Sequence, residues 1–305
     1  MRNLIPFTAI FLSALLLISG CRRKEPAQID DAAIVRNAVA SQLKKRPDKL
    51  TTKDYEKTTA LDLKGTAISD LTLIKELTGL QDLRLSGTEV SDLTPIKALI
   101  NLQRLHLGGT QVSNIEPLKG LTKLQWLNLY DTQVRSLEPL KGLSNLQGLY
   151  LNKTHVSDLE PLRGLSKLQE LKLYETNVSN IEPLKGLSNL QALSLWGTKV
   201  SDVKPLKELS NLQSLDLSAD VANIEPLKEL SNLQSLSLGL TQVNDLEPLR
   251  GLSKLQRLYF SSTKVSNIEP LKGLSKLQTI NLPRTVSIKQ VDEFKKALPE
   301  IEIHR

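Results

Sequence analysis

The amino-acid sequence predicts an α/β repeat solenoid, in which short parallel strands form a concave sheet and 3₁₀ or irregular turns form the convex side. A pattern of the form L-x-x-L-x-L-x-x-T-x-V-S-D/N-L/I-E-P-L-K-G/E-L recurs every 22 residues from Leu61 to Leu215, and after one 21-residue step it resumes at Leu236, Leu258 and Ile280. No single turn of this kind can bury its own leucines, so neighbouring turns must stack. Residues 59–286 therefore form about eleven stacked repeats.

Each repeat divides into a strand, an inward turn and an outer return segment. The Leu-x-Leu pairs alternate as expected for a short strand with one buried face. The Glu-Pro-Leu-Lys segment that follows favours a 3₁₀ or irregular turn, because its proline opposes a long α-helix. Threonine, glutamine and the Ser-Asp or Ser-Asn pairs recur at fixed places. We therefore interpret them as structural residues of an inward ladder that hydrogen-bonds neighbouring backbone groups.

The segments at both ends of the repeats have the pattern of caps. Residues 30–58 predict a helical N-terminal cap, with one helix from Ala32 to about Lys45 and a short helix over residues 52–57. Residues 287–305 predict a C-terminal cap, in which a helix over 287–298 ends at Pro299 and a strand follows over 301–303. Such caps cover the leucines and sheet edges that the ends of a stack would expose.

One repeat, from Leu215 to Ser235, is a residue short and lacks the recurring threonine. A lost residue is expected to bend or loosen the stack locally. Sequence drift in a single repeat and a selected kink that shapes the concave face are the two interpretations.

Residues 1–20 are typical of a secretory signal peptide, with a basic start, an apolar run over residues 4–18 and small residues before Cys21. The run is shorter than the roughly 20 residues that a spanning helix needs. The sequence Ile18-Ser19-Gly20-Cys21 resembles a bacterial lipobox. This resemblance implies that Cys21 is the lipidation site, that palmitate-type acyl chains anchor it in a membrane, and that residues 21–29 form a lipidated tether. An ordinary signal peptide with a leftover thiol and an uncleaved anchor are the alternatives.

The lipobox also implies a localisation. We expect a lipid-anchored protein of the bacterial cell envelope, with its body in the periplasm or at the cell surface. Arg22 follows Cys21 where an aspartate could stand, which resembles the sorting pattern for the outer membrane if the cell has two membranes.

Charge and chemistry exclude several classes of function. The net charge is +7, but the basic residues alternate with acidic ones through the repeats, which is typical of a solvated surface and not of a phosphate-binding stripe. Cys21 is the only cysteine, so no intramolecular disulfide or cysteine-based metal cluster can form. No nucleophile–base pair, phosphate loop or carboxylate dyad departs from the repeat pattern. We therefore predict no enzyme activity, no cofactor, no metal and no nucleic-acid partner.

The repeat unit resembles the 22-residue leucine-rich repeats of the internalin family of bacterial surface proteins over about three quarters of the chain. The resemblance implies a leucine-rich-repeat horseshoe with a helical N-terminal cap. One departure is threonine at a position where many such repeats place asparagine. Because these repeats serve many unrelated partners, the resemblance predicts the fold more closely than the function.

Information about binding lies in the outward positions of the strands, where residues break the repeat pattern. Six of the seven tryptophans and tyrosines occupy such positions, and five of them lie on four successive repeats: Trp126, Tyr130, Tyr150, Tyr174 and Trp196. Large aromatic side chains are enriched in binding hot spots. The alternative is that aromatic residues occur on sheets simply because of their strand propensity. The other outward residues that we assign to the candidate site are Arg104, His106, Asn128, Asn152, Glu170 and Lys172.

The sequence therefore predicts a non-enzymatic, monomeric module that holds a protein partner on an aromatic patch of the concave sheet and is displayed from a bacterial membrane. Flat aromatic rings also suit sugar faces, so a glycan or cell-wall ligand is one alternative. A structural scaffold of the envelope is the other.

Overall fold

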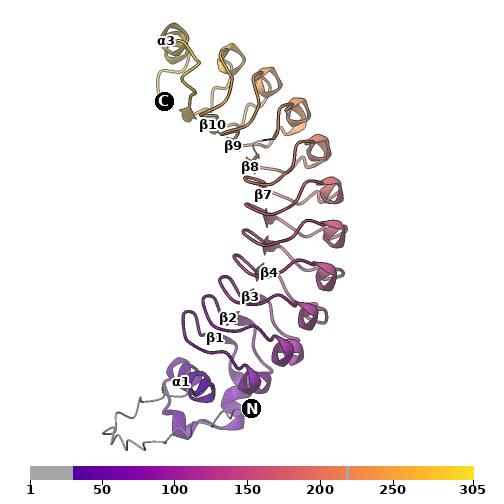
Figure 1. Cartoon of the computed structure of the whole chain (residues 1–305). Coiled ribbons are helices and arrows are strands. Elements are labelled where there is room, and N and C mark those ends of the chain that lie inside the picture. Colours follow the sequence, from indigo (N-terminus) through magenta and orange to yellow (C-terminus); the bar gives the residue numbers. More distant parts are fainter. Residues whose placement is uncertain (1–29, 218–219) are drawn as a thin grey trace, which may run out of the picture.

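The computed structural model describes residues 30–217 and 220–305. Across this part of the chain, three-residue strands follow one another in a single parallel sheet, in the order of the sequence, and the stack curves into an arc (Figure 1). The predicted horseshoe with a parallel concave sheet is confirmed. The strands are β1 (Ala60–Asp62), β2 (Asp82–Arg84), β3 (Arg104–His106), β4 (Trp126–Asn128), β5 (Gly148–Tyr150), β6 (Glu170–Lys172), β7 (Ala192–Ser194), β8 (Ser214–Asp216), β9 (Ser235–Ser237), β10 (Arg257–Tyr259), β11 (Thr279–Asn281) and β12 (Glu302–His304).

Short 3₁₀ helices form the convex side, as the Glu-Pro-Leu-Lys segments predict (Figure 1). Proline at the first or second position of most of them costs no hydrogen bond, because the first N–H groups of a helix have no partner within it. An aspartate or asparagine two residues before the turn accepts a hydrogen bond from its first N–H, as Asn114 Oδ1 does from Glu116 N at 2.9 Å. The 3₁₀ helices are η1 (Pro47–Lys49), η2 (Thr72–Glu76), η3 (Thr94–Ala98), η4 (Glu116–Leu118), η5 (Glu138–Leu140), η6 (Glu160–Leu162), η7 (Glu182–Leu184), η8 (Lys204–Glu208), η9 (Glu225–Glu229), η10 (Glu247–Leu249) and η11 (Glu269–Leu271).

One continuous core runs through the described repeats. The strand leucines, the valine of each inward turn and the leucines of each convex segment are almost fully buried and belong to a single cluster. Phe260 takes the place of a strand leucine in its repeat and is also fully buried. Because the leucines are used in packing, the outward strand positions are the ones left free to vary.

The recurring polar residues are structural, but only threonine faces inward. Thr132 Oγ1 donates to the carbonyl of Leu129 at 2.7 Å, and most other threonines of the column make the same bond within their own repeat. The glutamines contribute through their backbone, as when Gln103 N donates to Gln81 O at 2.8 Å, while their side chains stay at the surface. The predicted inward ladder is therefore wrong for glutamine and for the Ser-Asp and Ser-Asn pairs, since the Asp and Asn side chains cap the 3₁₀ turns at the surface.

Helices cover both ends of the sheet. At the N-terminal end lie α1 (Asp31–Leu43), whose Val35 and Val39 are buried in the core, and α2 (Thr52–Lys57). At the C-terminal end α3 (Ile288–Ala297) buries Phe294. The last strand, β12, pairs with β11 and spans residues 302–304, one residue later in the sequence than the predicted 301–303. Every core residue and element described here lies after residue 29, so a chain that begins at residue 26 keeps all of them. In the described ranges, no helix is both long and apolar enough to cross a membrane.

Two regions of the sequence predictions fall on residues that the structure does not describe. The signal peptide, the tether and Cys21 lie outside the described residues. So do residues 218–219 of the shortened repeat, although β8 and β9 on either side of them stay in register, with Ser214 opposite Ser235.

Candidate binding surface on the concave sheet

The five predicted aromatic residues lie together on β4 to β7 and on the turns that follow these strands. We call Trp126, Tyr130, Tyr150, Tyr174 and Trp196 the aromatic patch. Adjacent strands bring Trp126 beside Gly148 and Asn128 beside Tyr150. Tyr130 and Trp196 remain 36% and 38% exposed, and the other three rings are partly buried.

The strand residues of the patch hold one another in place. A Cβ atom on Gly148 would lie 2.0 Å from Trp126 Cε3, so the indole ring lies directly over this glycine. The rings of Trp126 and Tyr150 are tilted at 55° with their centroids 6.3 Å apart. Tyr150 Oη donates to Glu170 Oε2 at 2.8 Å, and Lys172 Nζ lies 3.3 Å from the other oxygen of that carboxylate. Burial and the hydrogen bond to Glu170 together raise the pKa of Tyr150 to about 12.

The turn residues of the patch form a second connected row. Tyr174 and Trp196 lie with their centroids 5.3 Å apart at an interplanar angle of 33°. Lys153 Nζ lies 5.8 Å from the ring centroids of both Tyr130 and Tyr174, which is within the range of cation–π attraction. The ammonium group therefore links two rings that come from turns on either side of it.

The two predicted asparagines position the tyrosine backbone. Asn128 Oδ1 accepts from Tyr130 N at 2.8 Å, and Asn152 Oδ1 accepts from Tyr174 N in the next repeat at 3.1 Å. Both amides thus fix the course of the chain beside the rings.

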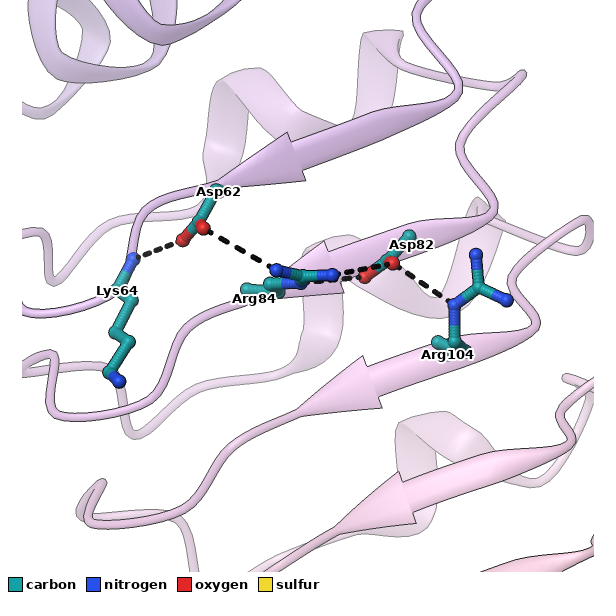
Figure 2. Close-up of polar contacts among 5 residues, drawn as sticks. All are labelled: Asp62, Lys64, Asp82, Arg84 and Arg104. Atoms are coloured by element: carbon teal, nitrogen blue, oxygen red, sulfur yellow. Dashed lines mark hydrogen bonds and ion pairs between the residues drawn. The ribbon is translucent and has the colours of Figure 1, made fainter.

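A charged cluster borders the patch on its N-terminal side (Figure 2). Asp82 is nearly buried, and its carboxylate lies 3.0 Å from Arg104 Nε and 3.3 Å from Arg84 Nη2. Burial alone would raise the pKa of Asp82, but the hydrogen bonds from Arg104 and Arg84 outweigh that effect and hold it below its usual value. Arg84 also lies 3.8 Å from Asp62. Burial lowers the pKa of the neighbouring His106, which favours its uncharged form.

Two open hollows lie along this border. One, of about 160 Å³, lies among Arg104, His106, Trp126, Asn128 and Tyr150. A wider one, of about 720 Å³, extends from Asp62 past Arg84 and His106 to Tyr130. The predicted site residues Arg104, His106, Asn128 and the N-terminal half of the aromatic patch therefore share one contoured surface.

Several residues of this surface escaped the sequence prediction. After each of the strands β1 to β7 the chain passes through a left-handed position. It is glycine at Gly109 and Gly197 but charged in the three repeats between them, where Asp131, Lys153 and Glu175 have φ of 53°, 56° and 54°. Side chains are uncommon at such φ, and residues held there cluster at functional sites. The signal was present in the sequence as an interruption of the glycine column.

The described residues contain no group of three or more His, Cys, Asp or Glu side chains that could hold a metal ion. The surface therefore offers aromatic faces, one oriented arginine and a lysine, which are groups that bind a ligand by contact.

Comparisons with known proteins agree with this architecture. The family model described as "Leucine Rich repeats (2 copies)" matches residues 100–142, 122–164 and 144–186. A comparison with curated proteins finds no match.

Among solved structures, an internalin of Listeria monocytogenes, InlF, is similar over 89% of this chain and 81% of its own length, with 26% identity and a TM-score of 0.81. Internalin C2 of the same organism is similar over 82% of this chain and 92% of its own, with 26% identity and a TM-score of 0.54. A leucine-rich-repeat protein of Leptospira interrogans, 24% identical, shares the fold over 83% of this chain and 62% of its own, with a TM-score of 0.63.

Proposed function

We propose that this internalin-like leucine-rich-repeat protein is a non-enzymatic module that holds a protein partner on the aromatic patch and is displayed from a bacterial membrane by lipid on Cys21. The observation that carries the proposal is the connected aromatic patch itself. Its rings are seated against Gly148, Glu170 and Lys153 before any partner arrives.

Pre-seated rings favour binding because little rotamer freedom is lost when the partner docks. Tyrosine and tryptophan are the residues most enriched in hot spots. Interactions with proteins are also the general role of leucine-rich repeats, which supports a protein partner over a purely structural role.

The convex surface of the described repeats presents mainly charged pairs. On the convex side Glu and Lys or Arg pair at i and i+3, as in Glu160 with Arg163 at 2.8 Å. Exposed pairs of this kind contribute little to stability, because water screens them, and they present mixed charge to solvent. This pattern favours the concave face as the functional one and disfavours a phosphate-binding stripe.

Partner capture tests the proposal. The chain from residue 26 onward is immobilised and exposed to envelope extract, beside a variant in which the five residues of the aromatic patch are replaced by alanine. We expect a protein that the wild type retains and the variant loses, with circular-dichroism spectra unchanged. Retention of the same proteins by both would refute the assignment of the patch.

A glycan ligand is the second candidate, because the exposed faces of Tyr130 and Trp196 are flat and open to solvent. Retention on peptidoglycan or polysaccharide columns, lost in the same variant and without any captured protein, would favour it. A structural scaffold predicts that the variant changes no binding at all.

Membrane display by Cys21 and a monomeric state are separate parts of the proposal. Labelling with palmitate should modify the wild type and not a Cys21→Ser variant, which should also be released from membranes. Light scattering of the chain from residue 26 should give the mass of a monomer, and a dimer mass would contradict that part.

A further inference from the structure

The orientation of Arg104 sets it apart from an ordinary surface arginine. Its Nε donates a hydrogen bond to the nearly buried carboxylate of Asp82 on β2. Arg84, two residues further along β2, contacts the same carboxylate. Figure 2 shows the two terminal nitrogens of Arg104 pointing away from Asp82. Within the described residues, neither of them has a hydrogen-bond or ion-pair partner. The guanidinium is thus fixed at one edge and free at the other.

Arg104 also lines the 160 Å³ hollow, whose aromatic walls are fixed. Trp126 is seated over Gly148, and Tyr150 is held by its hydrogen bond to Glu170. The hydroxyl of Tyr150 is therefore already engaged, and its ring presents an apolar face. His106, whose pKa burial lowers, completes the lining of the hollow.

The chain's own neighbouring carboxylates are already paired elsewhere. Asp82 is shared by Arg84 and Arg104 Nε, and Glu170 accepts from Tyr150 and pairs with Lys172. The terminal nitrogens of Arg104 are thus donors without a carboxylate partner among the described residues. A planar guanidinium edge is complementary to a carboxylate, which it binds through two parallel hydrogen bonds.

We propose that this hollow is a carboxylate slot: the protein partner places one aspartate or glutamate side chain in it, beside Trp126 and Tyr150, with its carboxylate on the terminal nitrogens of Arg104. The methylene groups of that side chain lie against the two rings. This inference rests on the proposed function and adds the chemistry of the partner, which is an acidic residue at the centre of its contact with the patch.

The test uses a defined probe and does not require the partner. N-acetylglutamate N-methylamide is titrated into the ¹⁵N-labelled chain from residue 26 onward at constant ionic strength, and the glutamine analogue, which has the same shape without the charge, is titrated in parallel. The chain has two tryptophans, so two indole N–H signals are expected. Trp126 reports on the slot, and Trp196, three strands or roughly 14 Å away, serves as the internal reference.

The expected result is a saturable shift of the Trp126 signal with the glutamate probe and a response at least roughly tenfold weaker with the glutamine probe, because a charge-assisted pair is lost. Arg104→Gln should abolish the response, and Arg104→Lys should weaken it, because lysine keeps the charge but loses the fork. Arg257 occupies the same position on β10, so Arg257→Gln is the matched control and should change nothing.

Equal responses to the two probes, an unshifted Trp126 signal, or a full response in Arg104→Gln would overturn the slot. If a partner is captured through the aromatic patch but Arg104→Gln does not weaken it, the proposed function stands and the slot fails. If the probe binds as expected and no partner is ever captured, the slot stands and the proposed function fails.

Discussion

A substitution at Gly148 would displace the indole ring of Trp126 from its packing position without removing any aromatic residue. In a Gly148→Ala variant the new Cβ would lie 2.0 and 2.2 Å from Trp126 Cε3 and Cζ3. Carbon atoms in contact lie about 3.5–4.0 Å apart, so the indole must move by roughly 1.5 Å or more. Overpacking of a core costs about 1–3 kcal/mol. Because Trp126 is partly exposed and can swing toward solvent, we expect the low end of that range, about 1 kcal/mol.

The displacement should affect the surface more than the fold. The tilted contact between Trp126 and Tyr150 would be lost, and aromatic pairs of this kind are worth about 0.5–1.5 kcal/mol. Urea unfolding measures the change in stability, and the Trp126 indole signal reports the movement of the ring. We expect Gly148→Ala to shift that signal and to weaken partner capture.

Gly120 supplies the matched control. It lies just after η4 on the convex side, and a Cβ added there would meet nothing within 4 Å. Gly120→Ala should therefore change the free energy of unfolding by no more than about 0.5 kcal/mol and leave Trp126 unmoved. An unchanged Trp126 signal in Gly148→Ala would refute the reasoning that the glycine seats the ring.

Three further predictions follow from single residues. Lys153→Gly should weaken partner capture but should not lower the free energy of unfolding, because relief of a left-handed side chain offsets the lost cation–π contacts. A clear loss of stability in urea unfolding would show that Lys153 is a structural residue. Hydrogen bonds from Lys45 and Thr51 lower the pKa of Asp54 from 3.8 to about 2, so the stability that its ionised form contributes is present above pH 4 and is lost as the pH falls toward 2. Thermal unfolding across this pH range should therefore show a steeper loss of stability in the wild type than in Asp54→Asn. Parallel curves for the two proteins would contradict this prediction. Leu171→Ala leaves a cavity at a fully buried position on β6 and should lower the free energy of unfolding, measured in urea, by about 2–5 kcal/mol. A decrease of less than about 1 kcal/mol would contradict a close-packed core.

The sequence predicted the solenoid because its period alone specifies stacking. Leu-x-Leu alternation predicted most of the strands, and the proline of most convex segments predicted the 3₁₀ turns. The prediction that the glutamine side chains face inward was wrong because recurrence shows that a position is structural, but not whether its backbone or its side chain makes the hydrogen bonds. At Gln103 the backbone N–H and carbonyl form the ladder, and the side chain is free to face the surface.

The aromatic patch was predictable as a set of residues that break the repeat, but its internal contacts were not. The pairing of Trp126 with Gly148, and of Tyr150 with Glu170, depends on rotamers that carry no signature in the sequence. Lys153 could have been found, because it interrupts the glycine column, and that interruption has meaning only once the left-handed backbone at this position is known.

Site-specific photo-crosslinking tests the central claim, that a protein partner sits on the aromatic patch, most directly. In one variant a photoreactive residue replaces Lys172 on β6, between β5, which carries Tyr150, and β7, which Trp196 follows. In a second variant it replaces the exposed Lys207 of η8 on the convex side. Cells that express each full-length variant are irradiated, and adducts are identified by mass spectrometry. We expect a protein adduct from position 172 and no adduct of that protein from position 207. If the same protein is crosslinked from position 207 alone, the partner does not sit on the aromatic patch.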